Sequence, residues 1–246
     1  MNSISANLNI MIKACDKASK VLIKDFGEIE KLQVSKKGPS DFVTNSDIKT
    51  EKIIIEELKK ARPNYSILSE ENGIEKNKDT DHTWIIDPID GTTNYLHGIP
   101  HFAISIALKF KNEIISGLIF DPIKDEMFYA EKDNGAFLNN QRVKVSQKSK
   151  MDECLFATGG KINNEFDILY RKSGCAALDL AYVACGRYDG YFQYNLNLWD
   201  IAAGIILVNE AGGQINEINL GNKKKIKVIA SSSNIASKLR KILDKF

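Results

Sequence analysis

The stretch WIIDPIDGTTNYLHG, residues 84–98, decides how the rest of the chain is interpreted. Three apolar residues lead into DPIDGTTN (87–94), where two carboxylates and two hydroxyls surround a proline and a glycine. Asp-Pro and Asp-Gly are common turn dipeptides, so one interpretation is a plain turn after a buried strand. Divalent cations prefer oxygen ligands, and phosphate oxygens accept hydrogen bonds from backbone N–H groups at helix starts. The other interpretation is therefore a site for metal and phosphate.

The first half of the chain predicts two helices and a run of strands. Residues 5–26 carry apolar groups at helical spacing, which predicts an opening amphipathic helix. A second helix is predicted over about 46–61, with hydroxyl residues near its start and Pro63 just past its end. YSILSEE and TWIIDPID each predict a short buried strand that ends in acids. From Phe102 to Val145, short β-rich runs separated by Asn, Gly and Asp-Pro turns predict an antiparallel meander.

After Met151 the pattern alternates between strands and helices. Strands are predicted in CLFATGG, DGYFQYN, GQINEI and KVIAS, and helices over about 173–186, 200–211 and from about Asn234. This alternation is typical of a layered α/β unit. The whole chain therefore predicts an α+β fold, a layered αβαβα sandwich with an antiparallel meander sheet first and an α/β sheet second. With no repeat or linker, residues 1–246 are expected to form one domain, with halves at about 1–150 and 151–246.

Composition is that of a soluble globular protein, with 43% hydrophobic and 27% charged residues. The net charge of +2 is too small to indicate nucleic acid as an obligatory partner, and the lysine-rich run 222–227 is interpreted as a solvated face. The four cysteines form no CxxC pair and are expected to be reduced. No apolar run approaches the ~20 residues of a membrane span. We expect a cytoplasmic protein with no membrane partner.

Acidic residues fall at several predicted strand ends or helix starts: Asp47, Glu70 with Glu71, Asp87 with Asp90, and Asp200. Each alone has a structural explanation, because acids stabilise helix N-termini and are common in solvated turns. Together they are harder to explain in this way, since layered folds place ligands where strand ends converge. Two Mg²⁺ ions ~3.5–4 Å apart can clamp a phosphoryl group and ionise a water for in-line attack. The combination favours the metal and phosphate site.

Other chemistries are less well supported. The chain contains neither a GxxxxGK[ST] phosphate loop nor a GxGxxG fingerprint, and it has no serine nucleophile elbow. His97 and His101 have the spacing of a helical zinc pair, but Gly98 and Pro100 interrupt that helix. Zinc is therefore not expected.

Two longer runs, DPIDGTTNYLHGIPHFAISIAL and WDIAAGIILVNEAGG, resemble the signature motifs of the inositol monophosphatase family. This family is part of the lithium-sensitive, Mg²⁺-dependent phosphatase superfamily. DFVTNSD, SEEN and GCAALDLAYVACGRYDGYF fall in the expected order, so the resemblance covers most of the chain and is nearest to the bacterial inositol-phosphatase-like branch. It implies a Mg²⁺-dependent phosphomonoesterase acting on inositol monophosphate or a similar small polyol phosphate. A homodimer and sensitivity to Li⁺ are also implied.

The resemblance also implies roles for matching positions. One metal would be held by Glu70, Asp87 and the carbonyl of Ile89, and a second by Asp87, Asp90 and Asp200. A weaker third site would combine Glu70 with Asp47. The catalytic residues would be Glu70 and Thr92, which orient the attacking water, with the Thr92 hydroxyl paired to Asp47. The implied substrate contacts are Gly91, Thr92, Gly174, Cys175, Ala176 and Gln193.

Gln193 departs from the family pattern. Seven residues before the motif aspartate, the family commonly carries a glutamate that accepts hydrogen bonds from substrate hydroxyls. An amide keeps one acceptor but adds two donors and removes a charge, which leaves inositol specificity open. The alternatives are a 3'(2'),5'-bisphosphate nucleotidase, a sugar bisphosphatase or a histidinol-phosphate phosphatase. A role as a transcription or RNA-processing factor is a further alternative, because some bacterial relatives bind the transcription-elongation machinery.

Overall fold

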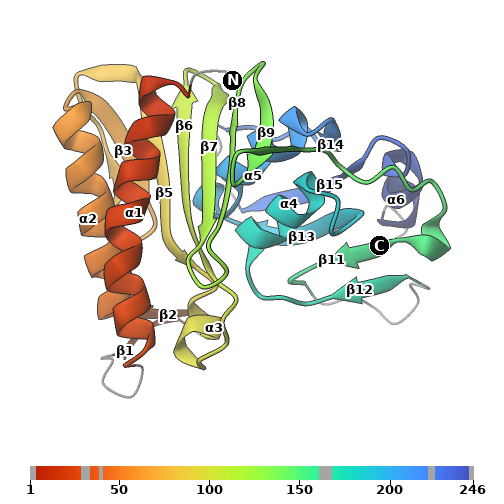
Figure 1. Cartoon of the computed structure of the whole chain (residues 1–246), viewed down its shortest axis with the longest axis horizontal. Coiled ribbons are helices and arrows are strands. Elements are labelled where there is room, and N and C mark those ends of the chain that lie inside the picture. Colours follow the sequence, from red (N-terminus) through yellow and green to blue (C-terminus); the bar gives the residue numbers. More distant parts are fainter. Residues whose placement is uncertain (1–3, 29–33, 39–40, 161–167, 221–224, 244–246) are drawn as a thin grey trace.

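The computed structural model describes residues 4–28, 34–38, 41–160, 168–220 and 225–243, with only the backbone of 34–38 and 41–43. Two β-sheets alternate with layers of helices in this part of the chain (Figure 1). The order of the layers is α1 with α2, an eight-stranded sheet, α4 with α5, a five-stranded sheet, and α6. The predicted αβαβα sandwich is therefore confirmed. Residues 222–224, half of the lysine-rich run 222–227, lie outside the described residues.

The outer helix layer consists of α1 (Ala6–Phe26) and α2 (Asn45–Ala61). The Ser5 hydroxyl caps α1 by accepting from the backbone N–H of Leu8 at 3.1 Å. Both helices bury their apolar stripe against the eight-stranded sheet, as the helical spacing predicted. The hairpin of β1 (Val34–Gly38) and β2 (Asp41–Thr44), which leads into α2, was not predicted.

The larger sheet has the strand order β10-β9-β8-β7-β6-β5-β3-β4. From β6 to β10 it is the antiparallel meander that was predicted, and β5 pairs antiparallel with β6. Strand β3 pairs with β5 in parallel, and β4 forms an unpredicted edge. Its strands are β3 (Tyr65–Ser69), β4 (Gly73–Glu75), β5 (Asp79–Asp90), β6 (Ala103–Phe110), β7 (Glu113–Asp121), β8 (Glu126–Glu131), β9 (Gly135–Leu138) and β10 (Gln141–Val143).

The central layer consists of α4 (Ala176–Ala184) and α5 (Leu198–Glu210), both rich in alanine and branched apolar residues. These helices are apolar on most of their surface because they are packed between two sheets, and they form the largest buried cluster. Helix α4 corresponds to the helix predicted over about 173–186 and is shorter than predicted at both ends. The short helix α3 (Thr92–Leu96) connects β5 to β6.

The second sheet is mixed, with the order β12-β11-β13-β15-β14. Strand β11 is parallel to β12 and β13, while β13, β15 and β14 are antiparallel. The one-turn 3₁₀ helix η2 (Met151–Glu153) precedes it, and α6 covers its outer face. The remaining elements are β11 (Leu155–Ala157), β12 (Leu169–Arg171), β13 (Gly190–Leu196), β14 (Gly213–Ile215), β15 (Ile226–Ser232) and α6 (Ala236–Leu243). Among the described residues, no helix has the length and apolar character needed to cross a membrane.

Candidate active site

The end of β5 is bulged, and the bulge contains the DPID sequence. Asp87 pairs with Ser105 on β6, but the next pair is Asp90 with Ala103, so one residue more lies on β5 than on its partner. Pro88 fits there because it has no N–H group to donate to the ladder. Bulges redirect side chains, and here Asp87, Ile89 and Asp90 all line one pocket.

That pocket is a cavity of about 670 Å³ at the meeting point of β5, α3, β13 and the N-terminal ends of α4 and α5. It brings together residues that lie more than one hundred positions apart in the sequence. All the predicted site residues line it except Asp47 and Cys175. Those that do are Glu70, Asp87, Ile89, Asp90, Gly91, Thr92, Gly174, Ala176, Gln193 and Asp200.

Asp47 lies just behind the pocket and is buried in the first turn of α2. Its Oδ2 accepts hydrogen bonds from Thr44, at 2.8 Å from the backbone N and at 2.6 Å from Oγ1, which completes a capping box. Its Oδ1 faces Thr92 Oγ1 at 3.5 Å, whereas that hydroxyl lies only 3.0 Å from the Ile89 carbonyl oxygen. The expected pairing of Thr92 with Asp47 is thus a long contact, and the shorter hydrogen bond goes to Ile89.

The carboxylate of Asp90 lies at the N-terminus of α4. Its Oδ2 accepts from Ala177 N at 2.5 Å and from Cys175 Sγ at 3.2 Å. Burial and the nearby charge of Asp200 nevertheless raise the pKa of Asp90 to about 7. The Cys175 thiol is buried and directed at Asp90, so it supports that carboxylate from behind the pocket lining.

The acids around the pocket repel one another. Burial raises the pKa of Asp87 well above its usual range, and the charges of Glu70, Asp90, Asp200 and Asp47 raise it further. Burial also raises the pKa of Asp47 and of Asp200 to about 6. Excess negative charge held in a buried site is stabilised by a bound cation.

The donor chemistry of this site fits a hard divalent ion, because carboxylate and carbonyl oxygens are the ligands that Mg²⁺ takes. In the described part of the chain, however, no group of three or more Asp, Glu, His or Cys side chains is arranged as a ready metal cage. Two carboxylates are turned to backbone N–H groups, Asp87 to Ile89 at 3.1 Å and Asp90 to Ala177. An ion would bind with side-chain rotation and with water or substrate as further ligands, as is usual for Mg²⁺.

Several residues of the site were missed in the sequence: Gly159, Asn197, Trp199 and Lys225 of the pocket lining, and Glu51 behind it. Glu51 on α2 is completely buried and holds the turn that follows β3 and carries Glu70. It accepts from Ser69 Oγ and Glu71 N, both at 2.9 Å, and from Asn72 through N at 3.1 Å and Nδ2 at 2.5 Å. A signal was present, because Glu51 follows Asp47 by four residues and so lies on the same face of the helix.

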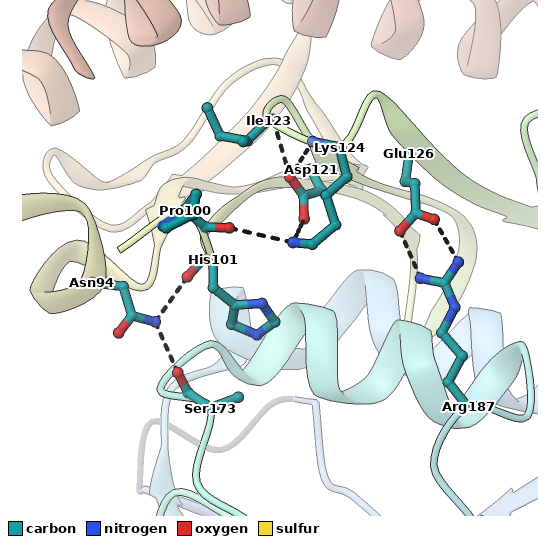
Figure 2. Close-up of polar contacts among 9 residues, drawn as sticks. All are labelled: Asn94, Pro100, His101, Asp121, Ile123, Lys124, Glu126, Ser173 and Arg187. Carbon is teal, nitrogen blue, oxygen red and sulfur yellow. Dashed lines mark hydrogen bonds and ion pairs between the residues drawn. The ribbon is translucent and has the colours of Figure 1, made fainter. Parts of the chain in front are cut away.

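Asn94 on α3 joins the two halves of the site. Figure 2 shows its Nδ2 between two carbonyl oxygens, His101 O and Ser173 O, each at 2.8 Å. Ser173 in turn donates through Oγ to Asp179 Oδ1 at 2.7 Å. Burial raises the pKa of Asp179 to about 8. These contacts fix the Gly174 loop beside the start of α3.

Comparison with known proteins agrees with this geometry. The model of the inositol monophosphatase family matches residues 5–245. The chain is 44% identical to an inositol-1-monophosphatase of Rhizobium meliloti, over 98% of this chain and 97% of that protein. It is 39% identical to the Nus factor SuhB of Haemophilus influenzae, over 94% and 93% of the two chains.

A solved structure shows the same fold. The crystal structure of the extragenic suppressor protein suhB from Bartonella henselae superposes with a TM-score of 0.92 at 44% identity. The match covers 98% of this chain and 99% of that one. Because the family model spans nearly the whole sequence and the likeness extends to the complete fold, the chain belongs to the inositol monophosphatase family of phosphoric monoester hydrolases.

Proposed function

We propose that this protein is a Mg²⁺-dependent phosphomonoesterase that hydrolyses inositol monophosphate or a similar small polyol phosphate. The observation that carries the proposal is the β5 bulge, which places Asp87, Ile89 and Asp90 on the lining of one pocket. The backbone N–H groups of α3 follow at once, where phosphate oxygens are readily bound. Family membership supports the reaction class.

Six residues would hold the metal ions, divided between the two main sites and the weaker third site. Bound Mg²⁺ would supply positive charge to the phosphoryl oxygens and lower the pKa of a coordinated water. The mutual repulsion of the acids supports this assignment, since a cation would relieve it. The residues are Asp47, Glu70, Asp87, Ile89, Asp90 and Asp200.

The protein's own part of the chemistry is to position the water and the phosphate. Glu70 and the Thr92 hydroxyl would orient the attacking water, since Thr92 Oγ1 donates to Ile89 O and retains lone pairs that can accept. Gly91 has a left-handed φ of 98°, which turns the chain into α3 and presents N–H groups of Gly91 and Thr92 to the phosphate. Donors fixed in advance stabilise the charge that develops on the phosphoryl oxygens.

The likeness to the family also supports properties beyond the reaction. We propose a homodimer, which light scattering would detect as twice the 27.5 kDa chain mass. We also propose a cytoplasmic location and inhibition by Li⁺ at concentrations that leave Na⁺ without effect. The Li⁺ and Na⁺ comparison at constant ionic strength separates a specific effect from salt screening.

The proposed activity is tested by phosphate release from a panel of substrates, with Mg²⁺ and with EDTA. The panel is inositol 1-phosphate, glycerol 2-phosphate, fructose 1,6-bisphosphate, 3'-phosphoadenosine 5'-phosphate and histidinol phosphate, so that it also tests the related phosphatase activities. We expect Mg²⁺-dependent release that Asp90→Asn abolishes. Release that persists in EDTA, or no release from any substrate, would contradict the proposal.

A second candidate function is a role in transcription. It is favoured by the 39% identity to a protein named Nus factor SuhB. If this role is the primary one, the Asp90→Asn variant will complement a deletion of the gene, although it releases no phosphate. If the variant fails in both assays although it folds normally, the transcription role is not independent of catalysis.

A further inference from the structure

The pocket wall formed by β13, the start of α5 and the residue before β15 presents hydrogen-bond donors. Gln193 and Lys225 line this wall, together with Asn197 and Trp199. We call Gln193 and Lys225 the donor pair. Lys225 is the single basic side chain among the described residues of the pocket lining. The wall thus differs in charge from the acids of the β5 bulge.

The amide orientation of Gln193 follows from its neighbour Tyr191. Tyr191 OH donates to Gln193 Oε1 at 2.8 Å. Tyr191 is fully buried and surrounded by acids, which raises the pKa of its phenol and keeps the proton on its oxygen. Because the acceptor end of the amide is used in this way, the Nε2 donors are the end that remains for a ligand.

Close packing holds this arrangement in place. A Cβ atom on Gly159 would lie only 2.1 Å from Gln193 Oε1, so the amide lies directly on the glycine backbone. No described residue accepts a hydrogen bond from Gln193 Nε2. Gly159 also lines the pocket, so the amide group is held at the cavity wall.

Lys225 supplies the positive charge of the wall. Its Nζ donates to Asn197 Oδ1 at 2.7 Å, which uses one of three ammonium donors. Among the described residues no other acceptor is bonded to this ammonium group, so two donors remain for a ligand in the pocket. An amide and an ammonium group together form a good hydrogen-bonding partner for an oxyanion and a poor one for a hydroxyl that must donate.

We propose that the donor pair forms a subsite for a second oxyanion on the alcohol part of the substrate, either a carboxylate or a second phosphate. This inference rests on the proposed phosphatase function and narrows its substrates from polyol phosphates in general to acidic ones. The cavity of about 670 Å³ has room for such a group beside the phosphate that is cleaved. A carboxylate side chain at position 193 would repel the same group.

The test uses two substrates that differ at one carbon. Glycerol 3-phosphate and 3-phosphoglycerate share the phosphorylated CH₂–O group, but the far CH₂OH of the first is a carboxylate in the second. The measured quantity is the kcat/KM for 3-phosphoglycerate divided by that for glycerol 3-phosphate. Fructose 1,6-bisphosphate and fructose 1-phosphate form a second pair that tests a phosphate in place of the carboxylate.

We expect the ratio to exceed one in the wild-type protein and to fall about tenfold or more in Gln193→Glu, because like charges then face each other. Lys225→Met should lower it several-fold, and added salt should reduce the preference of the wild type. Lys227→Met is the matched control. Its Nζ lies over the Tyr194 ring at 5.0 Å, and Lys227 does not line the pocket, so the ratio should not change.

The outcomes separate the two proposals. The subsite alone is overturned if the protein releases phosphate but the kcat/KM ratio of the wild type is one or less. It is also overturned if neither Gln193→Glu nor Lys225→Met lowers that ratio. The absence of Mg²⁺-dependent release from all four compounds and from inositol 1-phosphate overturns the phosphatase proposal and the subsite with it. Circular dichroism and thermal melts confirm that each variant is folded.

Discussion

Glu51 illustrates how a buried side chain that does not line the pocket can determine the position of one that does. Its two carboxylate oxygens accept four hydrogen bonds from the turn after β3, and that turn carries Glu70 to the pocket. A carboxylate has only acceptors, which suits a site surrounded by donors. Position 51 therefore requires a side chain that accepts several hydrogen bonds in a completely buried place.

Replacing Glu51 by Gln should destabilise the protein and weaken Mg²⁺ activation. The amide NH₂ would face backbone N–H groups, and a buried donor left unsatisfied costs about 1–3 kcal/mol. Displacement of Glu70 should raise the Mg²⁺ concentration for half-maximal phosphate release about tenfold, in line with lost support of metal ligands. Urea unfolding and Mg²⁺ titration of activity measure the two effects.

Glu56→Gln is the control, because Glu56 is exposed on the same helix. It should leave both the free energy of unfolding and the Mg²⁺ dependence unchanged. An equal Mg²⁺ requirement in Glu51→Gln and wild type would show that the turn does not position Glu70.

Among the secondary-structure elements, the junction between the bulged end of β5 and the short helix α3 restricts most strongly which residue can occupy a position. Gly91 lies between them with φ at 98°, and a Cβ atom there would lie 3.1 Å from the His101 carbonyl oxygen. A side chain is disfavoured both by the backbone conformation and by this contact. The element boundary therefore depends on one residue.

Gly91→Ala should cost more stability than a glycine substitution with positive φ alone. Gly73 has φ of 70° but nothing within 4 Å of its Cβ position, so Gly73→Ala measures the backbone effect, about 1–2 kcal/mol. Gly91→Ala should exceed it and should also lower kcat at least about tenfold, because the α3 N–H groups are displaced. Equal stability and activity of the two variants would disprove the role of the close contact.

The same elements show how much of the fold the sequence predicts. Helices α1 and α2 and the meander have long regular patterns and were predicted nearly to their ends, whereas the short edge strands β4 and β12 were not predicted. The acids of DPID were visible because turn and metal chemistry are local in sequence. The turn of Cys175 towards Asp90 and the contacts of Glu51 were not predictable, since they depend on packing between distant segments.

For the molecule as a whole, the helices and sheets form alternating layers (Figure 1). The pocket where β5, β13 and the starts of α4 and α5 meet collects the acids. The carboxyl groups of Asp47, Asp90 and Asp200 have pKa values raised to about 6, 7 and 6, with burial as the main cause. Each folded-state pKa lies above the usual value of about 4. Folding without a cation is therefore opposed by these groups at neutral and alkaline pH.

The pH dependence of stability in EDTA follows from these shifts. Between about pH 4 and pH 7 the folded chain keeps protons that the unfolded chain has released, so the contribution of these acids to stability falls as the pH rises. Mg²⁺ competes with those protons, and its stabilising effect should therefore grow with pH. Thermal melts at pH 6, 7 and 8.5 should show an increasing Tm difference between Mg²⁺ and EDTA samples.

Asp90→Asn provides the internal comparison for these melts, because it removes one of the repelling charges. It should reduce both the loss of stability with pH in EDTA and the Tm gain from Mg²⁺. A Tm gain that is independent of pH, or larger at pH 6 than at pH 8.5, would contradict the assignment of these acids to a cation site.

The most direct test of the central claim is the rate of phosphate release from inositol 1-phosphate and 3-phosphoglycerate, measured against free Mg²⁺ for wild type and Asp90→Asn side by side. We predict a saturable dependence on Mg²⁺ with at least one substrate for wild type, and a rate at least about 100-fold lower for the folded variant, since a lost ligand removes both binding and charge. Equal rates for the two proteins, or a wild-type rate that does not depend on Mg²⁺, would show that the acids of the β5 bulge are not the metal site of a phosphatase.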